Sequence, residues 1–296
     1  MNHGPTHTES KGVCIYCGAR GVPLSDEHIV PYAIGGSHVI RKASCRACAK
    51  ITGAFEQKVL RDLWGDARAS FNAPTRRKKE RRSHITMPDA GAGSLTLPVA
   101  EHPGGFVFYA MCKAGLLQGF SNEVDLSAGW RLVVVDDDKR RQNFLAKYPD
   151  RLTMRFRHVP KDFARMIAKI GYGHIMTALD PGDFNPICVP YILGKADNVS
   201  FVVGGTAQAQ GQTQEGYQLQ SAVFGGGARV LLIALVRLLA NTSAPAYHVV
   251  VGDVAGADRV LHALTKLGVD SGQLPALANQ NDHWVPDVKP LPYWLK

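Results

Sequence analysis

Two Cys-x-x-Cys pairs constrain this chain more than any other feature of its sequence. Cys14 and Cys17 form the first pair, Cys45 and Cys48 form the second, and 27 residues separate the two pairs. Four thiolates at such spacing form one tetrahedral zinc site, and the zinc then holds together a segment too short to build its own core. We therefore predict a structural Zn²⁺ ion bound by these four cysteines.

Composition and charge narrow the class of protein. A hydrophobic content of 45% and a charged content of 20% are typical of a globular chain and exclude wholesale disorder. The N-terminus lacks the apolar stretch of a signal peptide, and the longest apolar run, Val230 to Ala240, is too short to cross a bilayer. We expect a cytoplasmic protein with no membrane partner, whose cysteines meet reducing conditions that favour metal binding over disulfides.

The residues between and after the cysteine pairs predict a small set of elements. β-branched residues in Leu24–Pro31 predict a short strand, and Val39 and Ile40 predict the beginning of a returning strand. Ser44 is a candidate N-cap for a helix that begins near the second cysteine pair and stops near Gly65. The expected order is therefore strand, loop, strand, helix.

One face of this helix has an acidic residue that can point toward the first strand. Cys48, Thr52 and Glu56 are four residues apart, so their side chains share a face of the helix. Glu56 can then point toward the strand that carries the adjacent pair Glu27 and His28. The spacing thus places two carboxylates and an imidazole within possible reach of each other.

This series of motifs resembles the HNH endonucleases. The chain reads C-x2-C, E-H-I-V-P, G-G and C-x2-C over residues 14–61, and the family has a ββα-metal fold with a structural zinc. The resemblance implies that His28 is the general base that activates water. It also implies that Glu27, together with a residue from the following helix, binds a catalytic divalent cation such as Mg²⁺.

Two positions depart from the family pattern and leave the helix ligand open. Ile40 stands where the central Asn is usual, and Ala49 follows the second cysteine pair where His or Asn is frequent. Glu56 is our first choice for the second ligand because carboxylate oxygens suit Mg²⁺ or Mn²⁺. Thr52 and His38 are weaker candidates.

A dense cationic run follows the predicted helix. Such a run makes salt-dependent, sequence-indifferent contacts to phosphates, although a solvated linker has the same composition. Arg61 and Arg68 could extend the same face. We expect duplex DNA as the partner, with the nucleic-acid contacts made by Arg76, Arg77, Lys78, Lys79, Arg81 and Arg82.

The fold class we predict is α+β, with a small zinc-stabilised ββα-metal (HNH) domain followed by a larger mixed α+β domain. The expected divisions are a disordered N-terminus at 1–11, the HNH domain at 12–70, a basic linker at 71–94 and the α+β domain at 95–296. The role of the last region stays open among target recognition, ligand sensing and homo-oligomerisation. It lacks the phosphate-binding and esterase motifs G-x-x-x-x-G-K-[S/T] and G-x-S-x-G.

Within that larger region the apolar pattern predicts particular elements. A helix is expected from Phe163 to Ile175, and a second, buried helix from Val230 to Ala240. Strands are expected at Ile187–Leu193, Val199–Val203 and Tyr247–Val251.

Together these observations favour a metal-dependent endonuclease that hydrolyses DNA phosphodiester bonds. Water attack on a phosphodiester needs a base with a pKa near neutrality, for which histidine is the usual choice, and a divalent ion to stabilise the added negative charge. Two alternatives stay open. The chain could be a catalytically inactive, zinc-dependent nucleic-acid-binding protein, or an interaction protein in which the zinc segment is only a scaffold.

Overall fold

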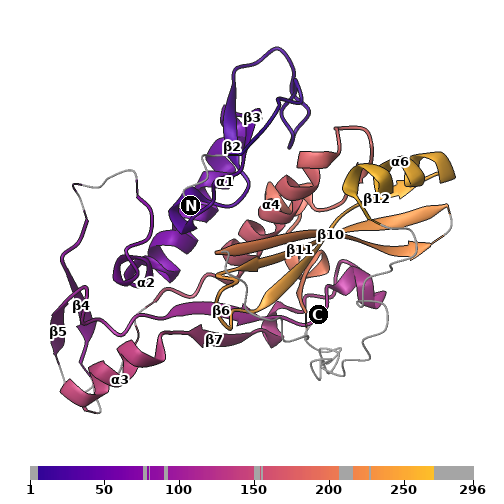
Figure 1. Ribbon diagram of the computed structural model, residues 1–296. Helices are drawn as coiled ribbons and strands as arrows, with labels where there is room; N and C mark the ends of the chain where they lie inside the picture. The colour runs from indigo at the N-terminus through magenta and orange to yellow at the C-terminus, as the bar shows by residue number, and fades with distance from the viewer. Residues whose placement is uncertain are drawn as a thin grey trace.

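The computed structural model describes residues 6–75, 79, 81–89, 93–149, 154, 156–206, 216–226 and 228–269. A long helix, α4 (Pro160–Ala178), lies at the centre of this arrangement. The N-terminal zinc segment packs against one side of α4, and a five-stranded sheet packs against the other (Figure 1). The protein is therefore an N-terminal zinc-site domain followed by a larger α+β region, as the sequence predicts.

The N-terminal segment has the predicted order of strand, loop, strand and helix. Strand β2 (Leu24–His28) pairs antiparallel with β3 (Val39–Cys45), and helix α1 (Arg46–Lys58) follows directly. A short strand β1 (His7–Thr8) adds to β3 in parallel. Two of the N-terminal residues expected to be disordered thus belong to the sheet.

The helix differs from the prediction at its N-cap and ends near the predicted residue. Its N-cap is Cys45 rather than Ser44, and no side chain caps it. After α1 the chain continues as a π-helical turn, η2 (Val59–Leu63), which ends at Trp64, next to the predicted stop at Gly65, and a separate short helix, α2 (Gly65–Ser70), then begins. The π turn lets Leu63 and the neighbouring tryptophan face the core.

The five-stranded sheet is antiparallel. Its order is β10 (Tyr217–Gly226), β11 (Arg229–Leu238), β12 (Ala246–Ala255) and β8 (Asn185–Pro186), and β9 (Val203–Gly205) also pairs with β12. Helices α4 and α6 (Ala257–Leu267) pack on β12 and β11. The helix predicted from Phe163 and the strand predicted from Tyr247 are both confirmed.

Three predicted elements in this region are wrong. Val230–Ala240 is not a helix: it supplies β11, a central strand whose residues are largely covered, and a continuous apolar run does not distinguish such a strand from a buried helix. Ile187–Leu193 contains helix α5 (Val189–Ile192) rather than a strand. Val199–Val203 begins with a 3₁₀ turn, η6 (Val199–Phe201), and only its last residue enters β9.

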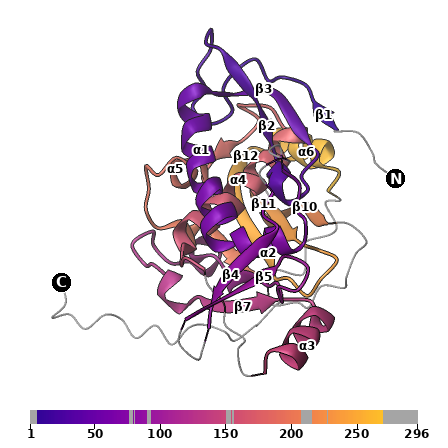
Figure 2. The ribbon, with the colours of Figure 1, turned by 90° about the vertical axis from the view of Figure 1, so that its left-hand side faces the viewer.

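The connection between the two parts contains two further hairpins. Strands β4 (His84–Pro88) and β5 (Ser94–Pro98) form the first, and β6 (Phe106–Ala110) and β7 (Arg131–Val135) form the second. The exposed helix α3 (Asp138–Lys147) follows and lies near the β4–β5 hairpin (Figure 2). Further short 3₁₀ helices among the described residues include η1 (Tyr32–Ile34), η4 (Gly115–Gln118) and η5 (Ser127–Gly129).

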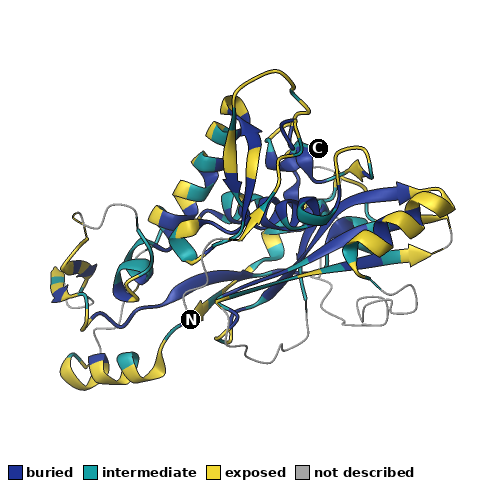
Figure 3. Cartoon of the chain, turned by 45° about the horizontal axis from the view of Figure 1, so that its top comes forward, coloured by how far each residue is buried: buried dark blue, intermediate teal, exposed yellow. Residues whose placement is uncertain are grey.

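One hydrophobic core runs through the zinc segment and the sheet region. The buried cluster includes residues from α1 and η2, from α4 and from β11 and β12. Trp64 lies where these parts meet: its indole N–H donates to the carbonyl of Val107 at 2.6 Å, and its ring contacts Phe106, Phe108 and Phe163. Figure 3 shows the buried residues along α4 and the sheet, whereas α3 is mostly exposed.

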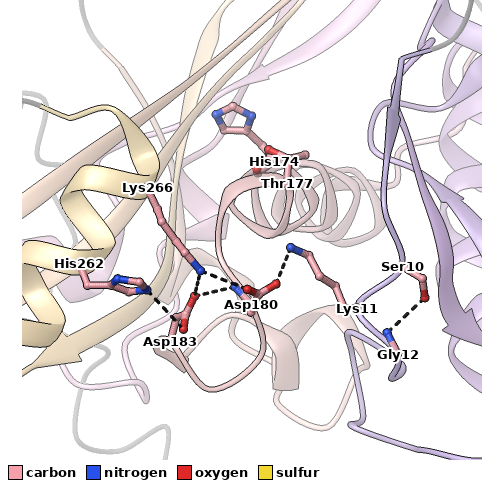
Figure 4. A network of polar contacts seen from close by, with 9 residues as sticks. All are labelled: Ser10, Lys11, Gly12, His174, Thr177, Asp180, Asp183, His262 and Lys266. Carbon is pink, nitrogen blue, oxygen red and sulfur yellow. Dashed lines mark hydrogen bonds and ion pairs between the residues drawn. The ribbon is translucent and has the colours of Figure 1, made fainter.

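A polar cluster also joins distant segments at the surface. Lys266 of α6 contacts Asp180 and Asp183, both at 3.1 Å, and Lys11 of the N-terminal segment contacts Asp180 at 2.7 Å (Figure 4). These ion pairs connect the N-terminal segment, the end of α4 and helix α6. Among the described residues, no helix is long and apolar enough to cross a membrane.

Candidate functional site: a zinc cluster and a lysine-filled carboxylate pair

The four predicted zinc ligands come together. One sulfur from each of Cys14, Cys17, Cys45 and Cys48 lies within 4.8 Å of the others. The Sγ atoms of Cys17 and Cys45 are 3.7 Å apart, which matches the separation of about 3.8 Å that tetrahedral Zn–S bonds of about 2.3 Å require. All six cysteines of the chain are free thiols, so no disulfide competes for these sulfurs. The donor set fits zinc.

Local backbone geometry brings the two cysteine pairs together. Gly18, at a φ of +71°, turns the chain after the first pair, and its N–H donates to the carbonyl of Cys14 at 2.8 Å. The second pair lies at the start of α1, where the backbone N–H of Cys48 lowers the pKa of Cys45 to about 7. Burial raises the pKa of Cys48. A bound cation stabilises all four thiolates, so metal binding releases protons here.

The loop after β2 fixes the position of His28. Gly35 has a φ of +91° and ends the turn η1, and an added Cβ on the buried Gly36 would lie 1.9 Å from the carbonyl oxygen of Val30. Only glycine allows that close approach of two backbone segments. His28 ends β2, is partly exposed, and lies with its ring centroid 6.2 Å from that of Tyr32.

Glu27 and Glu56 do come together, and a lysine lies between them. The Nζ atom of Lys169, from the middle of α4, is 2.9 Å from Oε1 of Glu27 and 3.0 Å from Oε1 of Glu56. It also donates to the carbonyl oxygens of His28 and of Ile29, the latter at 3.2 Å. The lysine side chain is only 1% exposed. Four oxygens therefore surround one buried ammonium.

The electrostatics of this cluster keep the lysine charged. Burial lowers the pKa of Lys169, but Glu27 and Glu56 outweigh it, so the net pKa lies above the ordinary value. Burial raises the pKa of Glu56, and the charge of Lys169 opposes that rise only in part. Tyr16 is buried beside both carboxylates, and burial followed by their charges raises its pKa well above the ordinary value. The cluster is a buried ion triad closed by a neutral phenol.

The residues around this pair do not fit the expected divalent cation. Mg²⁺ requires oxygen ligands at about 2.0–2.1 Å and usually keeps several waters. Here the oxygens of Glu27, Glu56 and Ile29 lie 2.9–3.2 Å from Nζ of Lys169, which are hydrogen-bond lengths. The side chains of Lys169 and Glu27 are only 1% and 8% exposed, which leaves little room for bound waters. An ammonium occupies the place between the carboxylates where the cation would bind.

The other candidate ligands face elsewhere. Thr52 donates to the carbonyl of Ala49 within its own helix, and Nε2 of His38 contacts Oγ1 of Thr8 at 2.8 Å. Burial lowers the pKa of His38. Ile40, at the usual position of Asn, is fully buried in the core. Of the candidates named from the sequence, only Glu56 approaches Glu27.

Comparison with known proteins supports the resemblance seen in the motifs. A family model described as HNH endonuclease matches residues 14–63, which span the cysteine cluster, His28 and helix α1. We call residues 14–63, which match this family model, the HNH segment. No curated protein and no solved structure matched the chain in the corresponding searches. The family match indicates a nuclease-type function for this HNH segment.

A wide cationic groove borders the HNH segment. One cavity of about 680 Å³ is lined by residues of η2, α2 and α3 and by residues that precede β4. A second cavity of about 630 Å³ shares Arg61 and Arg82 with the first. Together they are lined by two aspartates, Asp62 and Asp66, and by six arginines: Arg61, Arg68, Arg81, Arg82, Arg140 and Arg157. We call this surface the arginine groove.

Arg68 connects the arginine groove to the loop after His28. Its guanidinium donates to the carbonyl of Ala33 in η1 at 3.0 Å and to that of Leu60 at 2.9 Å. Arg82 pairs with Asp66 at 3.1 Å, whereas the exposed Arg61 makes no ion pair or hydrogen bond with any described residue through its side chain. Arg81 and Arg82 of the predicted basic run thus line the groove. Lys79 is exposed, and Arg76, Arg77 and Lys78 lie outside the described residues.

Sequence reasoning missed Lys169 and Tyr16. A signal for Lys169 existed, since it is the one Lys, Arg, Asp or Glu residue between Met166 and Met176, a stretch of the helix whose other residues are mostly apolar or small. A charge in such a helix needs a buried partner of opposite sign. Nothing in the sequence around Lys169 identifies Glu27 and Glu56 as those partners, because they lie more than a hundred residues away.

Proposed function

We propose that this protein acts on the phosphodiester backbone of nucleic acid, with DNA as the first substrate to test, and that His28 is the general base of its HNH segment. The observation that carries the proposal is the arginine groove, which adjoins the HNH segment and is tied to the loop after His28 through Arg68 and Ala33. The family match supports the nuclease class.

The groove supplies binding that does not depend on sequence. Each arginine that neutralises a phosphate releases counterions, so affinity falls steeply as salt rises. Exposed Arg61 and Arg82 are the groove residues best placed to make such contacts. In this arrangement a bound nucleic-acid backbone would pass beside η1, which follows His28 by a few residues in the sequence.

His28 supplies the chemistry. Its imidazole removes a proton from the attacking water as the oxygen bonds to phosphorus, and the proton later passes to the leaving sugar oxygen. The zinc ion, when bound by the four cysteines, holds the end of β3 and the start of α1 in place and takes no part in the reaction. Glu27 anchors the strand end that carries His28 through Lys169.

The test is a plasmid-nicking assay with a matched control. Zinc-loaded protein is incubated with supercoiled plasmid, in parallel with His28→Ala and with His262→Ala, which changes an exposed histidine on α6. We expect the wild type and His262→Ala to nick and His28→Ala to lose at least about 100-fold in rate, the usual contribution of a general base. Equal nicking by His28→Ala would refute the role of His28.

A second candidate function is nucleic-acid binding without cleavage. It is favoured by Ile40 and Ala49 at the two family positions and by Lys169 between the carboxylates. Under it, plasmid stays intact with every variant and with Mg²⁺, Mn²⁺ or Ni²⁺. A duplex still binds, and Arg61→Ala reduces the slope of log affinity against log salt by about 1 while Lys266→Ala on α6 leaves it unchanged.

A further inference from the structure

The cage around Lys169 has the donor set of a cation site. Four oxygens converge on Nζ, from the carboxylates of Glu27 and Glu56 and from the carbonyls of His28 and Ile29. Hard oxygen ligands of this kind suit Mg²⁺, Ca²⁺ or Mn²⁺ as well as an ammonium. The cage is therefore built for a cation, and the chain itself provides one.

The cation in the cage, the ammonium of Lys169, belongs to a buried and well-packed part of the fold. Lys169 lies in the middle of α4, between Ala168 and Ile170, both fully buried, and α4 packs on α1 and on the sheet. Removing the ammonium from its oxygens would leave a buried charge without partners, which costs several kcal/mol. An ion from solution would have to overcome that cost and also lose most of its waters, because the side chains of Lys169 and Glu27 are only 1% and 8% exposed.

We propose that the ammonium of Lys169 takes the place of the divalent cation in this HNH segment, so that Glu27 and Glu56 hold a side chain and bind no exchangeable metal. Lys169 is a positioning residue: it holds the carbonyls of His28 and Ile29 and thereby fixes the end of β2, and it is too buried to touch a substrate. The larger α+β region then completes the HNH site instead of being an independent appendage.

The inference rests on the proposed function only in identifying the carboxylate pair with the family's cation position. The experiment below measures the binding of a metal ion, so its result decides the inference whether or not the protein cuts DNA. Intact plasmid in the nicking assay would defeat the proposed function alone, and tight metal binding between the carboxylates would defeat the inference alone.

The experiment is a titration with Mn²⁺ on zinc-loaded full-length protein, followed by the electron paramagnetic resonance signal of free Mn²⁺. The wild type is compared with Lys169→Ala and with Lys161→Ala, which removes an exposed lysine from the first turn of the same helix. We expect the wild type and Lys161→Ala to leave the Mn²⁺ free, and Lys169→Ala to bind one Mn²⁺ per chain at least 10-fold more tightly, with a rise in melting temperature.

One result overturns the proposal directly. If the wild type binds one Mn²⁺ per chain and the double variant Glu27→Gln, Glu56→Gln does not, the carboxylates take a metal despite Lys169. This comparison remains decisive if Lys169→Ala fails to fold, because it needs only the wild type and a variant that keeps the shape of both side chains. A nicking rate that rises more than 10-fold with added Mg²⁺ and is abolished in that double variant would count against the proposal as well.

Discussion

The HNH segment contains two clusters of ligand-type side chains that obtain positive charge in different ways. Four sulfurs lie within 4.8 Å of one another, and the cation that would neutralise their thiolates is a metal ion from solution. The Glu27–Glu56 pair receives the ammonium of Lys169 from a helix more than a hundred residues later in the chain. One cluster depends on metal supply, whereas the other forms only when the whole chain folds.

The difference follows from where each set of ligands lies in the sequence. The cysteines are all within residues 14–48, so zinc can organise that segment locally. The carboxylates are just as close in sequence, but the helix that neutralises them packs between the HNH segment and the sheet. A zinc ion bound by the cysteines would therefore stabilise one segment, whereas Lys169 couples that segment to the rest of the protein.

Zinc removal should have the largest effect of any change to these two clusters. Cys48→Ser removes one buried thiolate, and because a structural zinc supplies most of the folding free energy of such a segment, we expect loss of the ion and unfolding of residues 14–45. Zinc content and hydrogen exchange measure both. Retention of zinc with normal exchange protection in Cys48→Ser would show that the ion is not structural.

Lys169→Met should have the next largest effect. It leaves two carboxylates in a buried site without their counter-ion, so we expect a loss of about 3–5 kcal/mol in the free energy of unfolding. Urea denaturation of zinc-loaded protein measures it. The matched control is Lys266→Met, which also removes a lysine that contacts two carboxylates, but at the surface, and should cost no more than about 1 kcal/mol. Equal losses would mean that burial does not matter here.

Glu56→Gln should lower the free energy of unfolding by less than Lys169→Met does. Combined with Lys169→Met, it should restore part of the stability that the lysine substitution removes. Lys169 keeps Glu27 as its partner, and burial already raises the pKa of Glu56, so we expect a loss below about 2 kcal/mol. The double variant Lys169→Met, Glu56→Gln leaves one unpaired carboxylate instead of two. Its loss should therefore be smaller than that of Lys169→Met alone, and a double-mutant cycle from urea denaturation gives the coupling. Purely additive losses would contradict a shared ion triad.

Asp180→Asn should have the smallest effect and a defined pH dependence. Hydrogen bonds from Lys11 and then Lys266 hold the pKa of Asp180 below its ordinary value. Because the folded-state pKa is the lower one, the carboxylate stabilises the fold above its unfolded-state pKa, and this contribution is lost as pH falls through the folded-state value. At neutral pH we expect a loss of at most about 1 kcal/mol that high salt diminishes. The urea midpoint at neutral pH and below pH 3.8 tests the sign.

Much of the HNH segment was predictable because its signals are local. The cysteine spacing predicts a cluster that the structure brings together, and the acid–histidine pair and the double glycine lie where a strand ends and a turn begins. Glu56 approaches Glu27 because four-residue spacing fixes a helix face. By contrast, β11 was mistaken for a helix, since a strand covered on both faces loses the alternation that identifies strands.

The sequence by itself determined the four-cysteine cluster, the order of strand, strand and helix, and the convergence of the two glutamates. Only the tertiary structure decided what neutralises those glutamates and which arginines gather in one groove. The physical reason is range. Cysteine spacing and helix periodicity act over a few residues, whereas the pairing of Lys169 with Glu27 and Glu56 arises because α4 packs on α1, and nothing local to either segment specifies that contact.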